Sequence, residues 1–330
     1  MSSRERVLVS TSPVLQPSVV DTSWLTEQAR SLVTNVSRVV RGRDEAVRLV
    51  VVAVLSGGHA LIEDTPGSGK TTIARAVARS VAGRFQRIQG TPDLLPTDIT
   101  GSTVWDQGRH EFVFVAGPVF AHVLLLDEVN RTPPRTQSAL FEAMDEGAAT
   151  VDGVRHRMPE PFFVVATQNP VEQHGTYPLP EGQLDRFAVR VRLGPLDPAA
   201  ELLVVREQLV RATVEDLLPV LSASDLLAVQ HGVRGLHVGE PVLRYALALV
   251  HATRDEPRVV LGASSRAAIC LVRVAQAHAV LAGREYVMPD DVQRSAVPVL
   301  AHRLRLAHVG DSAEALVAGI VAATPVPVSR

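Results

Sequence analysis

Cysteine is nearly absent from this chain of 330 residues, which contains a single one, Cys270. One thiol cannot form an intrachain disulfide, and this cysteine usage gives no sign of an oxidising compartment. Cys270 lies in an apolar run with helical periodicity, so we expect its side chain to be packed in the interior rather than to be reactive.

The sequence also lacks a long hydrophobic run and an excess of charge. The longest apolar stretch, residues 47–62, is interrupted by Arg48, two glycines and His59, and it is too short to span a bilayer. Charged residues at positions 4–6 precede mixed Val, Ser and Thr, so we find no clear apolar core of a signal peptide. The formal net charge of −2 gives no strong signal for nucleic acid or an anionic membrane. We therefore expect a cytoplasmic globular protein without a membrane segment.

The chain does contain a Gly-rich junction between a strand and a helix. The stretch 59–72 indicates a short buried strand and then a Gly-rich turn, after which Lys70 and Thr71 open a helix. This order is typical of a phosphate-binding loop, in which Lys70 would reach the β- and γ-phosphates and the Thr71 hydroxyl would bind Mg²⁺. Asp64 stands where the usual pattern has its first glycine. The alternative is an ordinary strand–loop–helix corner.

A second apolar run ends in two acids. Residues 123–126 predict a buried parallel strand, and Asp127 and Glu128 follow directly. Asp127 would hold Mg²⁺ through water, and Glu128 would polarise the attacking water. The alternative is a buried strand that merely ends in solvated acids.

Three further side chains fit such a site. Residues 162–167 predict another buried strand, followed by Asn169, whose amide would hold the lytic water or the γ-phosphate. An Asn-Pro turn is the alternative there. Arg186 precedes the last predicted strand and Arg266 opens a later helix, and either would stabilise the charge of phosphoryl transfer. Isolated arginines are more commonly surface residues.

Strands that alternate with helices predict an α/β fold with a parallel sheet and right-handed crossovers. From about residue 196 helical periodicity continues and no strand pattern appears again. We expect a flexible tail at 1–22, a nucleotide-binding core at 23–195 and a separate all-helical domain at 196–330. Two β-prone runs predict a hairpin within residues 101–117, and residues 149–158 predict another.

Taken together, these stretches resemble the AAA+ ATPases, and within them the MoxR family. The resemblance covers about residue 25 to the C-terminus, and the stretches that carry it are residues 58–71, 127–144, 166–170 and 175–187. Asn-Arg-Thr-Pro-Pro at 130–134 and Tyr-Pro-Leu-Pro-Glu at 177–181 are far more specific than a phosphate loop. The missing first glycine is common in this family, so Asp64 fits it.

The resemblance assigns roles to individual residues. The expected nucleotide-binding residues are Val40 and Gly42 near adenine and the Walker A residues Thr65, Pro66, Gly67, Ser68, Gly69, Lys70, Thr71 and Thr72. Thr71 and Asp127 would bind the metal. The expected catalytic residues are Glu128 of Walker B, Asn169 as sensor 1, Arg186 as the arginine finger and Arg266 as sensor 2 in a C-terminal lid. Arg41, between Val40 and Gly42, departs from the family pattern.

The segment 91–117 resembles the helix-2 insert of the family. Phe112 and Phe114 then either face a central pore or simply pack the hairpin.

The resemblance implies ATP and Mg²⁺ as cofactors, and Arg186 lies beyond the nucleotide of its own chain in this fold. It would therefore complete a neighbour's site in a ring with a heterologous interface, and the superfamily implies a hexamer. We expect chaperone-like remodelling of client proteins, with a von Willebrand factor A domain protein as a possible partner. The alternatives are a DNA-associated motor, disfavoured by the net charge of −2, and an ATP-gated scaffold with little hydrolysis.

Overall fold

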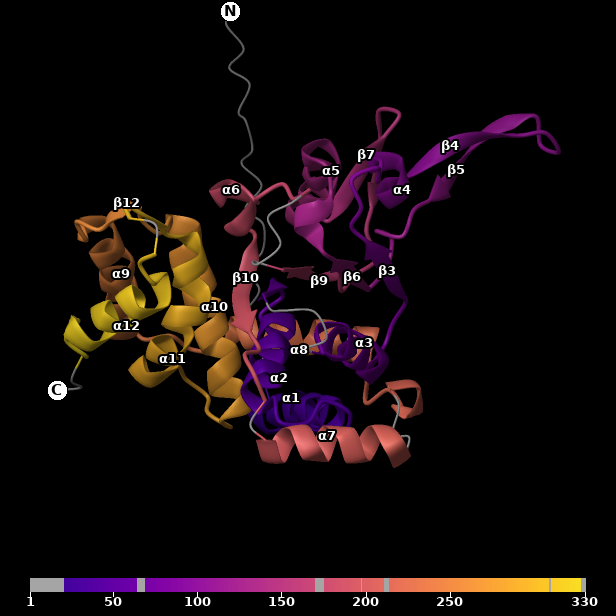
Figure 1. Ribbon diagram of the computed structural model, residues 1–330. Coiled ribbons are helices and arrows are strands. Elements are labelled where there is room, and N and C mark those ends of the chain that lie inside the picture. Colours follow the sequence, from indigo (N-terminus) through magenta and orange to yellow (C-terminus); the bar gives the residue numbers. More distant parts are fainter. Residues whose placement is uncertain are drawn as a thin grey trace, which may run out of the picture.

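A parallel sheet forms the centre of the computed structural model, which describes residues 21–63, 69–169, 175–196, 198–210, 214–308 and 310–327. Five strands lie in the order β10-β1-β9-β6-β3 (Figure 1). Their bounds are His59–Glu63 for β1, Phe85–Gln89 for β3, Val123–Asp127 for β6, Phe163–Gln168 for β9 and Phe187–Arg192 for β10. The predicted α/β fold with a parallel sheet is confirmed.

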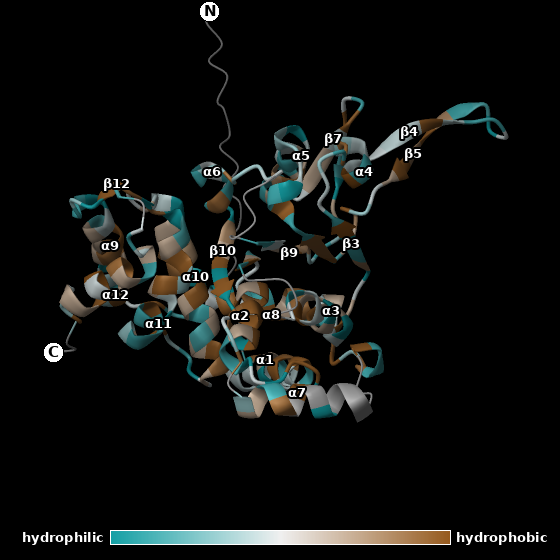
Figure 2. Cartoon of the chain, in the orientation of Figure 1, coloured by the Kyte–Doolittle hydropathy of each residue, from teal (hydrophilic) through white to brown (hydrophobic). Residues whose placement is uncertain are grey.

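Helices cover both faces of this sheet. On one face lie α1 (Thr22–Ser37), α2 (Asp44–Leu55) and α3 (Lys70–Ser80), and on the other α5 (Pro134–Glu146). Alternate strand residues point to opposite faces, so Leu125 packs on the side of α1, α2 and α3, whereas Leu124 and Leu126 pack toward α5. Burial on both faces explains the continuous apolar runs, and the later part of α2, from Leu49 to Leu55, is hydrophobic throughout (Figure 2).

The C-terminal region is mostly helical, as expected. It contains α7 (Pro198–Val210), α8 (Ala223–Gly235), α9 (Glu240–Asp255), α10 (Ser265–Leu281), α11 (Pro289–Leu300) and α12 (Ala313–Ala323). The expectation of no further strands was wrong in detail. β12 (Val259–Leu261) pairs with β13 (Arg305–Leu306), and β11 (Leu221–Ser222) pairs with β2 (Val81–Ala82). Pieces of two or three residues are too short to show a period of two.

The beginning of this region packs directly on the α/β core. The Gln230 amide of α8 donates a hydrogen bond to the Val54 carbonyl of α2 at 2.7 Å. The β11–β2 pairing adds a second tie between them. The helices α9 to α12 form a lobe beyond β10, at the edge of the sheet (Figure 1).

Two hairpins project on the α5 side of the sheet (Figure 1). After α4 (Pro96–Thr100), β4 (Gly101–Asp106) and β5 (Glu111–Ala116) form the longer one, and β7 (Ala148–Val151) and β8 (Val154–Arg157) form the other. Phe114 stacks on His156 with ring centroids 3.8 Å apart, so it packs between the hairpins. Phe112 is 72% exposed and contacts Trp105 edge-on. Phe114 therefore packs the hairpin, which was one of the two alternatives. Phe112 is exposed and available to contact another molecule.

No helix within the described ranges is both long and apolar enough to cross a membrane.

Candidate functional site

The carboxyl ends of β1, β9 and β6 lie side by side, because these neighbouring strands are parallel. We call this line of strand ends the sheet edge. Beyond β1, Lys70 is the first residue of α3 and is followed by Thr71 and Thr72. Gly69 caps this helix with φ of +95°, a conformation that favours glycine. The helix N-terminus gives this edge a partial positive charge. The predicted loop residues Thr65, Pro66, Gly67 and Ser68 lie outside the described residues.

Asp127 ends β6 and is only 6% exposed. Its Oδ1 accepts a hydrogen bond from the Thr167 hydroxyl at 3.2 Å. Its Oδ2 lies 3.5 Å from the Thr71 hydroxyl and accepts a shorter hydrogen bond, at 2.8 Å, from Nε of Arg87. Two residues predicted to bind the same metal are therefore adjacent, and Arg87 contacts one of them, Asp127.

Glu128 has a left-handed backbone, with φ of +56°. Its N–H donates to the Thr167 hydroxyl at 2.9 Å, so one threonine positions both acids. Its carboxylate accepts hydrogen bonds from Gln89 at 3.0 Å and from Arg131 at 3.1 Å. A non-glycine residue in this conformation is uncommon and is found preferentially at functional sites.

Gly90 allows the acidic strand to approach β3 closely. Its N–H donates to the Asp127 carbonyl at 2.7 Å. A Cβ atom at this position would lie 2.2 Å from the Glu128 carbonyl oxygen, which no side chain tolerates. Only glycine therefore fits here without displacing the backbone of both acids.

Asn169 follows β9 and is 4% exposed. Its carbonyl oxygen lies 3.4 Å from the Asn130 side-chain amide. Since Leu126 pairs with Ala166 in the neighbouring strand, Asn169 lies at the same sheet edge as Asp127. The structure thus brings Lys70, Thr71, both acids and Asn169 to one edge.

Arg186 and Arg266 lie at the opposite end of the strands, where the strands begin. Arg186 directly precedes β10, whose first residue, Phe187, pairs with His59 at the start of β1. Both arginines bind the carboxylate of Asp145, near the end of α5. The five residues of β1 separate the two ends by about 13 Å. Neither arginine therefore faces the Lys70 edge of its own chain.

The arginines belong to a positively charged cavity of about 230 Å³. Its charged lining consists of Arg186, Arg266, Arg273 and Arg303 with Asp145 and Asp185. Burial would raise the pKa of Asp145, but the hydrogen bonds and charges of Arg266 and Arg186 lower it below its ordinary value. Cys270 also lines this cavity, and burial raises the pKa of its thiol, which agrees with an unreactive packed residue.

His59, beside this cavity, has a structural role, because both of its ring nitrogens contact backbone groups. Its Nδ1 accepts the Val164 N–H at 3.1 Å, and its Nε2 lies 3.2 Å from the Met144 carbonyl. The pKa of His59 is lowered to about 4, chiefly because burial disfavours the charged ring. The neutral form with the proton on Nε2 satisfies both partners.

Val40 and Gly42, predicted near adenine, lie between α1 and α2. Val40 is buried in the core beneath the sheet. A Cβ on Gly42, which has φ of +67°, would lie 2.6 Å from the Cβ of Ala200 in α7. The structure therefore places this turn against α7, and its contact with adenine stays a prediction.

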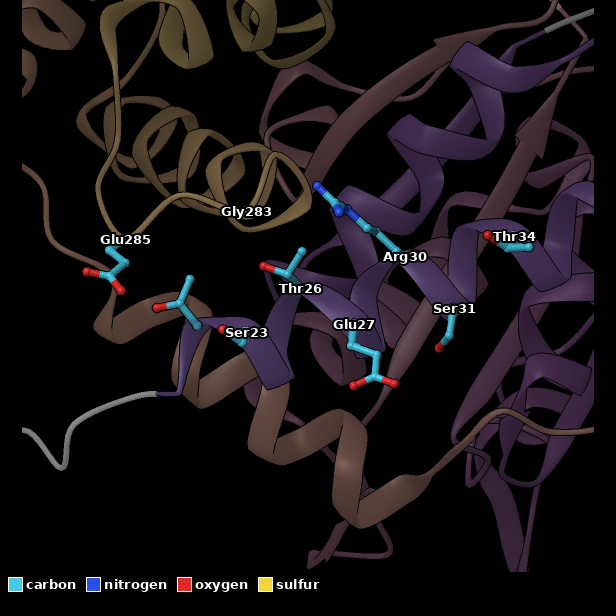
Figure 3. A pocket seen from close by; sticks show the side chains of 9 residues that line it. Ser23, Thr26, Glu27, Arg30, Ser31, Thr34, Gly283 and Glu285 are labelled. Atoms are coloured by element: carbon cyan, nitrogen blue, oxygen red, sulfur yellow. The ribbon is translucent and has the colours of Figure 1, made fainter.

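A separate cavity of about 640 Å³ runs along α1 (Figure 3). It is lined by Thr22, Ser23, Thr26, Glu27, Arg30, Ser31, Thr34, Gly283 and Glu285. None of these residues is among those predicted to bind nucleotide, so the sheet edge remains the candidate site.

The groups at the sheet edge suit a magnesium–nucleotide complex. Mg²⁺ prefers oxygen ligands and is commonly held by one or two protein groups together with phosphates and water. The Thr71 hydroxyl and the Asp127 carboxylate offer two such oxygens. In the part of the chain that the structure describes, no cluster of three His, Cys, Asp or Glu residues forms an all-protein metal site.

Sequence reasoning missed several residues that surround the acids. Arg87 and Gln89 point to Asp127 and Glu128 from β3, and Thr167 binds both acids. Arg87 and Gln89 lie two residues apart and so share one face of β3, but only the strand order shows that this face meets the acids. No sequence signal marked Asp145 as the partner of the two arginines.

Comparisons with known proteins place the chain among AAA proteins. Residues 59–189 match the family model described as "ATPase family associated with various cellular activities (AAA)", and residues 251–320 match an AAA lid domain.

Related proteins match over most of the chain. "Uncharacterized protein YeaC" of Bacillus subtilis is 45% identical over 302 residues, covering 90% of this chain and 94% of that protein. "Chaperone MoxR1" of Mycobacterium tuberculosis is 41% identical over 282 residues, covering 83% of this chain and 74% of that protein. A crystal structure of a protein from Cytophaga hutchinsonii superposes with a TM-score of 0.85 at 35% identity, covering 93% of this chain and 97% of that one.

Proposed function

The chain belongs to the MoxR family of AAA ATPases, and from this membership we propose that it hydrolyses ATP with Mg²⁺ and uses the energy to remodel partner proteins. The observation that carries the proposal is the Thr71 hydroxyl 3.5 Å from the Asp127 carboxylate, at the N-terminus of α3. A hydroxyl, a carboxylate and a lysine at one helix N-terminus are what a phosphate–metal complex requires.

Each residue at this edge has a definite task in hydrolysis. Lys70 and the α3 N-terminus bind the phosphates, and Thr71 and Asp127 would hold Mg²⁺, which neutralises phosphate charge when bound. Glu128 accepts the proton of the attacking water, and Gln89 and Arg131 orient its carboxylate. Asn169 positions the water or the γ-phosphate.

The two arginines act on a neighbouring subunit in this proposal. In their own chain they lie at the opposite end of the strands from Lys70. They belong to a cavity whose lining includes four arginines in all and two aspartates. Such a surplus of positive charge suits the γ-phosphate of another copy. The site is then incomplete until a second subunit brings Arg186 and Arg266, as in a hexameric ring.

Two variants test hydrolysis directly. Lys70→Ala removes the phosphate contact and Glu128→Gln removes the base, so each should lower the steady-state ATPase rate by about 100-fold or more. Glu142→Gln, at a half-buried residue of α5, is the matched control, because the amide oxygen can still accept the hydrogen bond from the Thr150 hydroxyl. Hydrolysis by both site variants at the parent rate would refute the proposal.

Mixing tests the shared site. Lys70→Ala and Arg186→Ala should each be inactive alone, but mixed rings would contain interfaces that pair an intact Lys70 with a neighbour's intact Arg186. Recovery of ATPase activity on mixing supports the shared site. If the mixture is as inactive as its components, Arg186 does not act in trans.

Remodelling requires a client. Glu128→Gln should bind ATP without turnover and retain both ring and client, for which the resemblance suggests a von Willebrand factor A domain protein. Affinity purification of this variant with ATP tests the idea. If no stoichiometric partner is recovered beyond that found with Lys70→Ala, the remodelling function loses its support.

A further inference from the structure

Arg87 lies on β3, next to the strand that carries the two acids. Its Nε donates to Oδ2 of Asp127 at 2.8 Å, and its Nη2 lies 2.7 Å from the same oxygen. Gln89 pairs with Asp127 in the parallel register, so Arg87 projects from the same face of β3, two residues earlier. The contact is therefore set by the sheet.

The oxygen that Arg87 holds is the one on the metal side of Asp127. Oδ2 faces the Thr71 hydroxyl at 3.5 Å, whereas Oδ1 is occupied by the Thr167 hydroxyl. A divalent ion between Thr71 and Asp127 would take Oδ2, where the guanidinium already lies. Two cations at one oxygen of a buried carboxylate repel each other strongly, because water screens them little there.

We propose that Arg87 is an internal cation that competes with Mg²⁺ for Asp127 and leaves its Oδ2 when a magnesium–nucleotide complex binds. The inference rests on the proposed nucleotide site and assigns a role to a residue outside the Walker motifs. The Asp127 side chain is 8% exposed, so its charge requires a partner at all times. The Arg87 side chain is 51% exposed and has room to move away.

The replacement of Arg87 by Mg²⁺ at Asp127 would also affect Glu128, the proposed catalytic acid–base residue. Arg87 donates a second hydrogen bond to the Gln89 side-chain oxygen at 3.3 Å, and the Gln89 amide donates to Glu128 at 3.0 Å. When the guanidinium leaves Asp127, the partners of Gln89 change with it. Metal binding at Asp127 is in this way connected to the orientation of Glu128.

Calorimetric titration with ADP measures the competition without hydrolysis. The ratio of the dissociation constant in EDTA to that in excess Mg²⁺ reports how strongly metal and nucleotide favour each other. Arg87→Ala should raise this ratio by about tenfold, the change expected when one charge-assisted competitor is lost. Arg87→Lys, which keeps the charge, should stay close to the parent ratio.

Arg84→Ala is the matched control, because it removes the same charge just before β3. Thermal melting in EDTA verifies the fold, and Arg87→Gln replaces Arg87→Ala if the latter does not fold. An unchanged ratio in the Arg87 variant overturns the inference. If Arg87 instead bound phosphate directly, both constants would weaken equally and the ratio would not move. A parent protein that binds no ADP at all would refute the proposed function itself.

Discussion

Arg266 of the helical lid binds Asp145 of α5, which precedes it by 121 residues, and Arg186 binds the same carboxylate. Because one acid holds two arginines from separate elements, it fixes both guanidinium groups relative to each other. Asp145 is therefore a positioning residue for the charge that we propose acts on a neighbouring subunit.

Asp145→Asn should slow hydrolysis without removing any group from the nucleotide site. The amide keeps the size of the side chain but loses the charge that orients Arg186 and Arg266. We expect kcat to fall about tenfold with KM nearly unchanged, since in the proposed mechanism these arginines act mainly in the transition state. Glu146→Gln, at the next position, is the control. Parent-like kcat in Asp145→Asn would contradict the role.

Gly90→Ala should damage catalysis through the backbone. Its Cβ would lie 2.2 Å from the Glu128 carbonyl and 2.9 Å from that of Asp127, so both acids must shift. A shift of about 1 Å at a catalytic group can cost about 100-fold in rate. Gly182→Ala, where an added Cβ meets no heavy atom within 4 Å, is the control. Equal ATPase rates in the two variants would show that the close approach is unimportant.

The two phenylalanines of the β4–β5 hairpin should respond oppositely to truncation. Phe114→Ala removes the ring stacked on His156 and should lower the free energy of unfolding by about 2 kcal/mol, less than for a fully buried ring. Phe112→Ala should leave stability unchanged, because this ring is 72% exposed. Denaturant melts of both variants measure the difference. Equal destabilisation would mean that Phe112 is also packed in solution.

Stability should fall in mildly acidic solution because of His59. Its pKa in the folded protein is about 4, against 6.5 for an ordinary histidine, so the unfolded chain takes up a proton first as the pH falls. This contribution is complete above pH 6.5 and is lost toward pH 4, by about 3 kcal/mol in all. Burial also lowers the pKa of His278 and His302, which add to the slope.

His59→Asn should flatten the dependence of the melting temperature on pH between 7.5 and 4.5, because the amide can still accept the Val164 N–H and does not titrate. His251→Gln, at an exposed histidine, serves as the control. The same pH slope in His59→Asn and in the parent would assign the effect to other groups.

The sequence revealed the sheet and its acidic edge because burial on both faces leaves continuous apolar runs, as in residues 123–126. Asp127, Glu128 and Asn169 could be grouped because they end strands of one parallel sheet. Arg87 could not be assigned, since its contact requires knowing that β3 is the neighbour of β6. Asp145 depends on where the lid packs, which local periodicity does not encode.

α5 has one more consequence for the ring that we propose. Its first turn is tied to the segment after Glu128, because the Gln137 amide donates to the Thr132 carbonyl at 3.0 Å. Its last turn carries Asp145, and a helix of 13 residues is about 20 Å long and stiff. In the ring that we propose, a movement near Glu128 would therefore shift the arginines that face the adjacent subunit. The state of one nucleotide site would in this way be linked mechanically to the next.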